Sequence, residues 1–405
     1  MNPSVTPIWN PFKKGYLEDP YSAFRVFRET NPVHKGINGQ WMVFRYEDAK
    51  FVLSDQRFKT LSVSDLIKGA GLHLLVPDGL QRLSDVSLRW ILFLDAPIHN
   101  VVRGIVSKAW RSFDLKAAIE EIAKDVLNDL SQKPEPDIVR DLAIPIPPRV
   151  MCKLLGFPDE DHIALRTWSA AFGKVIEQFE TLETLLDCSK KAEEFFRYAQ
   201  KAVREKTAVP KDDLISKILI ENQALQQPLE TNEIISVISL LILAGNETLI
   251  NLLGQSVLQL LLNPIEKDRW SNDASISSKA ADELIRFISP AQFTTRVPTE
   301  DLSIRGTQIK EGERVMVSMA AANRDPDIFT EPDKLELTRQ VNPHIGFGHG
   351  AHFCLGAAMA KTEIGIAIPA LLERFPEIRL DPKRKFIWDT KFNTRGLKSL
   401  PVLLS

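Results

Sequence analysis

A single cysteine in a glycine-rich loop constrains this chain more than any other feature. The loop, Phe347–Gly356, reads Phe-Gly-His-Gly-Ala-His-Phe-Cys-Leu-Gly, and the apolar pattern that follows predicts a helix over 355–372. Cys354 therefore lies at a helix N-terminus, where the partial positive charge of the helix lowers the pKa of a thiol. The loop glycines permit turns and close approaches that side chains would block. These features favour a thiolate bound to a large, flat cofactor, with Phe347 limiting access of water.

Two other interpretations of the loop remain open. Zinc could be bound by His349, His352 and Cys354, but zinc sites usually have four ligands, and the local sequence supplies no fourth. Cys354 could also be a buried structural cysteine in a turn. The remaining cysteines, Cys152 and Cys188, are far from each other and from the loop, which fits packing roles in a reducing compartment better than disulfides.

The pattern Phe-Gly-x-Gly-x-His-x-Cys-Leu-Gly resembles the cysteine loop of the cytochrome P-450 family, the haem-thiolate monooxygenases. The resemblance implies that Cys354 is the axial ligand of the iron of haem b, where a thiolate favours O–O cleavage. Phe347, His352 and Gly356 would belong to the cofactor-binding loop, with His352 near a haem propionate. The implied fold is mainly α with small β-sheets (α+β). It would form a single domain over 1–405, with haem between a long central helix and the helix of the cysteine loop.

A second motif lies inside a long apolar segment that predicts a helix over 231–262. Ala244 and Thr248 are four positions apart and share a face, with Glu247 adjacent. A buried acid beside a hydroxyl suits proton delivery, and a threonine in mid-helix can bond back to the preceding turn. The stretch resembles the oxygen-binding Ala-Gly-x-Glu-Thr motif of the family, which implies that Glu247 and Thr248 are catalytic. The alternative is an amphipathic helix with a polar patch.

A third pattern places Glu283 and Arg286 three positions apart on one helical face, in an apolar setting. Such pairs are ordinary surface ion pairs when they occur alone. Here the pair resembles the family's Glu-x-x-Arg motif, and Arg339 matches the usual third member. The resemblance implies a structural ion-pair network that assembles the fold and takes no part in chemistry.

Basic residues in two further places match family positions that hold haem propionates. Asp95 can cap a helix, after which His99 and Arg103 are four apart and share one face. Two donors on one face can hold a carboxylate, and arginine can do so with two parallel hydrogen bonds. The resemblance assigns His99, Arg103 and also Arg296 to the propionates, whereas the alternative for each is an ordinary surface or capping residue.

Charge and hydropathy exclude several classes of protein. The 51 basic and 53 acidic residues give a net charge of −2, which offers no support for nucleic-acid binding. The N-terminal sequence has no charged start followed by an apolar core, so neither a signal peptide nor a membrane anchor is expected. Asn and Glu residues interrupt the apolar segment 231–262, which predicts a buried helix and not a membrane span. We expect a cytoplasmic protein that does not bind a membrane and resembles the soluble bacterial type of the family.

The resemblance implies a monooxygenase that inserts one oxygen atom from O2 into a hydrophobic small molecule by hydroxylation or epoxidation. The sequence contains no flavin or ferredoxin signature, so a separate ferredoxin- or flavodoxin-type donor with an NAD(P)H reductase is implied. The alternatives are a haem-thiolate peroxygenase or isomerase and a non-catalytic haem sensor. The candidate substrate-pocket residues are Leu75, Val76, Leu240, Ala244, Ala291, Gln292, Phe293 and Phe392.

The local patterns predict helices over 20–30 and 47–53, helices through most of 97–287, and a stretch over 60–89 that is hard to assign. Strands are predicted over 40–45, 302–309 and 314–318, and strand with turn over the tail 386–404.

Overall fold

The computed structural model describes residues 8–37, 39–61, 80–177 and 181–405, so the candidate pocket residues Leu75 and Val76 lie outside the described residues. The chain divides into two compact units, each made from separate stretches of sequence. The first unit contains residues 1–59, 123–143 and 250–405, and the second contains 60–122 and 144–249. The single domain over 1–405 stays a prediction.

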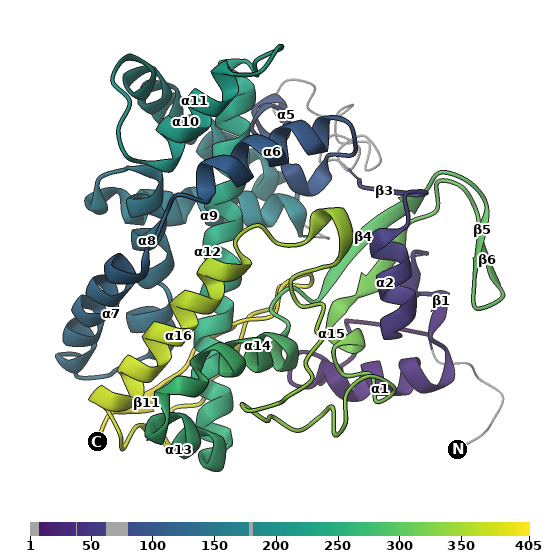
Figure 1. The fold of residues 1–405 in the computed structure, drawn as a ribbon. Coiled ribbons are helices and arrows are strands. Elements are labelled where there is room, and N and C mark those ends of the chain that lie inside the picture. Colours follow the sequence, from purple (N-terminus) through teal and green to yellow (C-terminus); the bar gives the residue numbers. More distant parts are fainter. Residues whose placement is uncertain (1–7, 38, 62–79, 178–180) are drawn as a thin grey trace. The chain divides into compact units, whose positions relative to one another are not determined.

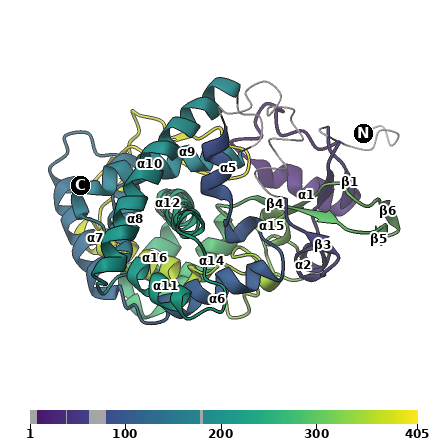
Figure 2. The ribbon, with the colours of Figure 1, turned by 90° about the horizontal axis from the view of Figure 1, so that it is seen from above.

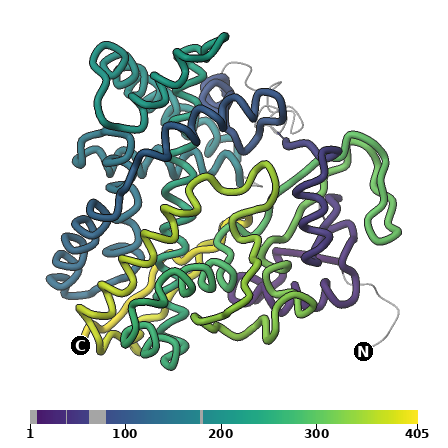
Figure 3. Tube along the Cα trace, viewed as in Figure 1, coloured from purple at the N-terminus to yellow at the C-terminus, as the bar shows by residue number. Residues whose placement is uncertain are grey.

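The first unit is built on a five-stranded sheet to which both ends of the sequence contribute. Only the pair β2–β7 is parallel, and all four residues of β7 are buried, as expected of the central strand. In Figure 3 the early, purple part of the trace lies beside the green part that carries the later strands. In spatial order the strands are β1 (Val33–Lys35), β2 (Trp41–Val43), β7 (Val315–Ser318), β4 (Phe293–Pro298) and β3 (Phe58–Lys59).

Helices complete the first unit, and the first two begin at or within one residue of the predicted positions. Asp19 caps the first helix by accepting hydrogen bonds from the backbone N–H groups of Tyr21 and Ser22 at 3.1 and 3.2 Å. Figure 1 shows α14 and α16, which pack against each other, on the lower part of this unit. The helices are α1 (Pro20–Thr30), α2 (Tyr46–Ser54), α13 (Pro264–Asn272), α14 (Ser277–Ile288), α15 (Met319–Ala322) and α16 (Ala357–Arg374), with a π-helical turn at Val139–Ala143.

Three small antiparallel pairs complete the β-structure of the first unit. The stretch 302–309, predicted as strand, forms a hairpin from β5 (Leu302–Ile304) and β6 (Thr307–Ile309). The tail pairs β9 (Ile387–Trp388) with β10 (Leu397–Ser399), and β8 (Arg379–Leu380) with β11 (Val402–Leu403). The predicted mixture of strand and turn in the tail is therefore confirmed.

The second unit is helical in its described residues, as predicted for this part of the chain. Prolines separate its helices: Pro158 follows α8, and Pro210 lies between α10 and α11. The helices are α5 (Gln81–Ser87), α6 (Ile98–Trp110), α8 (Ile146–Leu155), α9 (His162–Ile176), α10 (Leu182–Ala208) and α11 (Leu214–Gln223).

Two helices continue from one unit into the other along the chain: α7 (Lys116–Ser131) and α12 (Thr231–Leu262). The bounds of α12 are those predicted from the apolar pattern, and Figure 2 looks along its axis. This helix is long and apolar enough to cross a membrane by length and composition, but 72% of its most apolar stretch is buried within the structure. Burial accounts for its apolar character, in agreement with the prediction of a core helix.

A carboxyl group without a partner is buried in the middle of α16. Glu363 is fully buried, and neither of its carboxyl oxygens has a hydrogen-bond partner. Removal from water disfavours the charged form, so burial raises the pKa of the Glu363 carboxyl to about 8. At neutral pH the folded protein therefore carries this group largely protonated, whereas the unfolded chain carries it ionised.

Replacement of Glu363 should remove a pH-dependent cost of folding. The raised pKa makes the wild-type protein lose stability as pH rises from the usual carboxyl range to about 8, by at most about 1.4 kcal/mol per pH unit, because only the unfolded chain releases the proton. Glu363→Met should therefore gain stability over wild type between pH 5 and 8 in denaturant titrations. Glu373→Met, at an exposed position of the same helix, is the control, and equal pH dependence in wild type and Glu363→Met would contradict the argument.

Candidate active site

The cysteine loop is a series of tight turns that ends just before α16. Cys354 is half-buried, and its backbone N–H donates to the carbonyl of Phe347 at 2.8 Å, which closes the loop on itself. A 3-10 turn spans Gly350–His352, and α16 begins at Ala357, two residues later than predicted. The cysteine therefore precedes the helix by a turn, and its position is set by the loop's own backbone hydrogen bonds.

Glycines fasten the loop to two helices of the first unit. A Cβ at Gly346 would lie 2.7 Å from Cγ2 of Ile285 on α14, and one at Gly350 would lie 2.8 Å from the carbonyl oxygen of Leu53 on α2. Gly350 also has a φ of +72°, which L side chains rarely adopt. Gly350 was predicted to permit a turn or close approach, and the structure shows that it serves close packing; Gly346, just before the loop, does the same.

The chemistry of the loop fits a thiolate-bound planar group. A Cβ added at Gly356 would meet nothing within 4 Å, so the space beside this residue is open. Burial raises the pKa of the Cys152 thiol to about 12, and Cys188 is buried, so neither is suited to act as a thiolate. Across the described ranges no group of three or more His, Cys, Asp and Glu residues could hold a metal ion, which disfavours the zinc alternative.

Behind the loop, the three ion-pair residues form one buried network. Arg286 donates to both carboxyl oxygens of Glu283, from Nε at 2.7 Å and from Nη2 at 2.8 Å, and both side chains are fully buried. Arg339 donates from Nε to Glu283 at 3.1 Å. Arg286 also donates to the carbonyls of Asn323 and Pro332, at 2.9 and 2.8 Å. The network ties α14 to the chain that leads to the cysteine loop.

Arg296, the remaining basic candidate of this unit, lies on β4. Its side chain is buried, and Nη1 donates to the carbonyl of Thr295 at 2.9 Å and to the hydroxyl of Thr294 at 3.3 Å. The guanidinium is thus held by its own strand.

In the second unit, the motif of α12 has the predicted back-bond. The hydroxyl of Thr248 donates to the carbonyl of Ala244 at 2.9 Å, and Ala244 is exposed on the same face. The stem of Glu247 lies over α9, since a Cβ added at Gly173 would be 3.5 Å from its Cγ. The side chain of Glu247 is half-buried, so the expectation of a buried acid is met only in part.

Two further residues of this helix turn were not singled out from the sequence. Asn246 is fully buried, and its Nδ2 donates to the carbonyl of Ile242 at 2.6 Å. A Cβ at Gly245 would lie 2.5 Å from Sδ of Met151, so this glycine lets α8 approach α12. Asn246 could have been noticed from the sequence, because it is a polar residue in a mostly apolar helix.

The basic pair of the second unit lies on α6 as predicted. His99 is buried and Arg103 is half-buried, one turn further along the helix. The predicted role of the Asp95 side chain as helix cap is wrong. Its carboxylate accepts from the backbone N–H of Thr60 at 3.2 Å, and only its backbone carbonyl accepts from His99, at 3.0 Å. The Asp95 carboxylate therefore bonds to the segment around Thr60 and does not cap α6.

Several candidate pocket residues are packed into the core of the first unit. Phe293 stacks on Phe392 with ring centroids 5.2 Å apart, and both rings contact Trp9. Gln292 is buried, and its amide donates to the carbonyl of Ser289 at 2.6 Å. Phe293 and Gln292 are buried, whereas Phe392 is half-buried, and the prediction that these three residues line a substrate pocket stays a prediction.

The other candidate pocket residues lie at the sheet and on α12. Ala291 is half-buried, forms an isolated β-bridge with Thr394 and packs against a core cluster of the first unit. Leu240 is 8% exposed on α12, one turn before Ala244. Leu240, Ala244 and Thr248 thus share one strip of the helix.

Comparisons with known proteins agree with this geometry. A family model described as Cytochrome P450 matches residues 276–396. The chain is 34% identical to the polyketide biosynthesis cytochrome P450 PksS of Bacillus subtilis (strain 168), over 98% of this chain and 99% of that protein. It is 32% identical to the mycinamicin IV hydroxylase/epoxidase of Micromonospora griseorubida, over 99% of both. A crystal structure of P450BioI in complex with hexadec-9Z-enoic acid ligated acyl carrier protein matches with a TM-score of 0.87 and 32% identity, covering 96% of this chain and 99% of that one.

The chain therefore belongs to the cytochrome P450 family, and it is of the soluble bacterial type. It has the P450 fold and is a haem b-dependent monooxygenase. The mainly α architecture with small sheets is confirmed, and so are haem b as cofactor and the class of enzyme.

Proposed function

We propose that the protein hydroxylates or epoxidises a hydrophobic small molecule at a haem held by Cys354. The observation that carries this proposal is the half-buried thiol in a loop whose backbone is fastened on both sides, with open space beside Gly356. His352, His99, Arg103 and Arg296 would hold the propionates, and Phe347 would shield the sulfur. When bound, haem supplies the activation of O2, and a thiolate ligand favours O–O cleavage.

The chain's own contribution to the reaction is a proton path on α12. Because the Thr248 hydroxyl donates its proton to the carbonyl of Ala244, its oxygen remains open to accept a hydrogen bond from a bound group or water. Glu247 is half-exposed and can exchange a proton with solvent at its carboxylate. We assign Glu247 to proton uptake and Thr248 to positioning the proton at the reacting oxygen.

Thr248→Ala should uncouple reductant consumption from product formation. Without the hydroxyl, protons arrive unpositioned and reducing equivalents are released as peroxide. Product formed per NADPH should fall roughly tenfold or more, which is less than the about 10²–10⁴-fold that a positioned acid or base typically contributes to a rate. Product and peroxide measured beside NADPH consumption provide the test. Thr248→Ser, which keeps the hydroxyl, should stay close to wild type, and full coupling in Thr248→Ala would remove the residue from the mechanism.

The proposal also implies an electron donor and a cellular compartment for the reaction. Electrons would come from a ferredoxin- or flavodoxin-type partner with an NAD(P)H reductase, because the sequence contains neither a dinucleotide fingerprint nor an iron–sulfur cysteine cluster. The reaction would take place in the cytoplasm, where such donors are kept reduced.

The substrate class is open to direct measurement. The relatives include a polyketide enzyme and a hydroxylase/epoxidase, and one solved neighbour holds a fatty acyl chain on a carrier protein. An optical titration of the ferric protein should compare a free fatty acid, the same chain on an acyl carrier protein, a macrolide and a steroid. A shift with one class supports a binding pocket for it. Peroxide-driven turnover without reductase would favour a peroxygenase, and the absence of substrate-dependent NADPH consumption with a surrogate redox chain would favour a sensor.

A further inference from the structure

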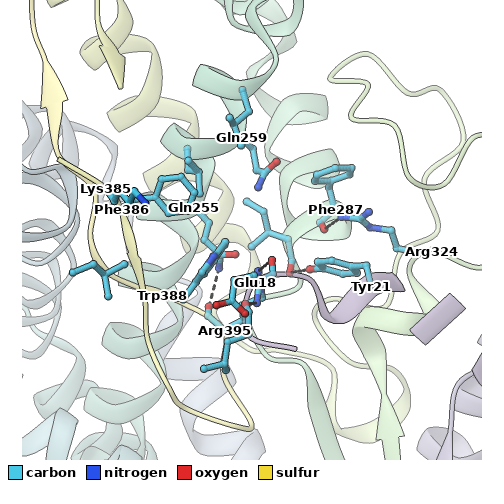
Figure 4. Close-up of a pocket in the computed structure, with 15 residues that line it drawn as sticks. Glu18, Tyr21, Gln255, Gln259, Phe287, Arg324, Lys385, Phe386, Trp388 and Arg395 are labelled. Carbon is cyan, nitrogen blue, oxygen red and sulfur yellow. Dashed lines mark hydrogen bonds between the residues drawn. The ribbon is translucent and has the colours of Figure 1, made fainter. Parts of the chain in front are cut away.

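A cavity of about 670 Å³ lies within the first unit and contains none of the residues assigned above to haem, catalysis or substrate. It is bordered by the start of α1, the last turns of α12, the end of α14 and the loop that carries β9 (Figure 4). Leu258, Leu262, Ile387 and Trp388 contribute to its apolar walls. The volume falls in the range of sites that bind small organic molecules.

One wall of the cavity carries a fixed cation. The guanidinium of Arg324 lies between the rings of Tyr21 and Phe287, at 3.8 Å from each ring centroid. Its Nη2 donates to the carbonyl of Phe287 at 2.8 Å and its Nη1 to Asp333 at 3.0 Å, but its Nε is buried without a partner. The side chain therefore cannot swing away, and it retains one unused donor.

A second cation of the lining, Arg395, lies 5.9 Å from the ring centroid of the same Tyr21. The guanidinium of Arg395 lies 3.7 Å above the ring of Trp388 and donates to the backbone carbonyls of Leu17 and Glu18 at 2.5 and 3.1 Å. Its own carbonyl accepts from Nε2 of Gln255 at 2.7 Å. These bonds hold the loop against α1 and α12, so the cavity is preformed.

Two polar side chains at the cavity have no protein partner among the described residues. The amide of Gln259 points into the cavity in Figure 4, and it makes no hydrogen bond to any residue that the structure describes. Lys385 is exposed at the rim and, among the described residues, forms no ion pair. Glu18 is the single carboxylate in the lining, against Arg324, Arg395 and Lys385.

We propose that this cavity is an accessory binding site for a small amphipathic carboxylate. The carboxylate would accept from the Lys385 ammonium and the Gln259 amide, with Arg324 and Arg395 fixed in the same lining. The hydrocarbon portion would lie along Leu258, Leu262 and Trp388. A neutral apolar ligand would leave the donors unsatisfied, and a strongly polar anion would leave the apolar walls uncovered, which selects a ligand with both parts.

Calorimetric titration of the full-length, haem-loaded protein with octanoate tests the proposal, with the visible spectrum recorded in parallel. Binding heat with no change of the haem spectrum is expected, and octanamide, which has the same chain without the charge, should bind at least about fivefold more weakly. Heat that appears only in step with a spectral shift would place octanoate at the haem and overturn the proposal. Equal affinity for the two compounds would also overturn it.

Variants locate the site independently of the haem. Lys385→Glu should weaken octanoate binding about fivefold, whereas Lys383→Glu, exposed on the same loop but outside the lining, should not. Gln259→Trp, which fills the cavity, should abolish the binding heat and leave the haem spectrum of the free protein unchanged. Equal binding by the two lysine variants, or wild-type binding by Gln259→Trp, would refute the site. Because the haem spectrum is read separately, failure of this proposal is distinguishable from failure of the proposed function.

Discussion

Cys354→Ser should lose the red-shifted Soret band of the ferrous–CO complex and essentially all monooxygenase activity. A serine hydroxyl stays protonated at neutral pH and is a harder, weaker donor than a thiolate, so the iron would lose the ligand that favours O–O cleavage. The backbone of the loop should be unaffected, because its closing bond joins the N–H of residue 354 to the carbonyl of Phe347 and involves no side chain. Visible spectroscopy of the reduced, CO-saturated protein is the measurement.

The matched controls are Cys152→Ala and Cys188→Ala, which alter the two other cysteines of the chain. Both positions are buried, so these variants should lose some stability and keep the spectrum. An unchanged Soret band in Cys354→Ser, or loss of the band in either control, would end the assignment of Cys354 as ligand.

The second large effect is expected on stability, from Glu283→Gln. The substitution removes the negative charge that Arg286 and Arg339 share and leaves both guanidinium groups buried beside a neutral amide. Breaking a buried ion pair by removing one partner typically costs about 3–5 kcal/mol. The free energy of unfolding, measured by denaturant titration of the haem-loaded protein, should fall by about that amount.

The adjacent acid supplies a matched control for this stability measurement. Asp282 accepts from Lys361 at 2.7 Å and lies 3.4 Å from Nε2 of His344, but about a third of the Asp282 and Lys361 side chains is exposed. Asp282→Asn should therefore cost less than about 1 kcal/mol, as is usual for exposed pairs. Similar losses of unfolding free energy in Glu283→Gln and Asp282→Asn would mean that the buried network stabilises the fold no more than an exposed ion pair does.

Regular patterns and contacts local in sequence could be predicted, and contacts between distant segments could not. The bounds of α12 followed from an apolar run, and the bond from Thr248 to Ala244 follows from a spacing of four on a helix. By contrast, Arg286 donates to the backbone carbonyls of residues 323 and 332, and the sequence around residue 286 does not predict these contacts.

The same limit applies at the candidate site. Phe293 and Phe392 have the apolar character of pocket residues, but their contacts with Trp9, from the other end of the chain, could not be predicted from the local sequence. Asp95 is of a residue type that commonly caps helices, but its carboxylate accepts a hydrogen bond from the backbone N–H of Thr60. Glu363 could have been found, because the residues four before and four after it, Met359 and Ala367, are buried and place it on the apolar face of α16.

The backbone of the cysteine loop is held in place by close packing of Gly346 against α14 and of Gly350 against α2. The position of the loop therefore does not depend on the side chain at residue 354. Exchange of the side chain at position 354 therefore alters the electronic character of the ligand while the surrounding backbone stays where it is. A histidine or a selenocysteine installed there would report how much of the reactivity belongs to sulfur, with little contribution from a displaced scaffold.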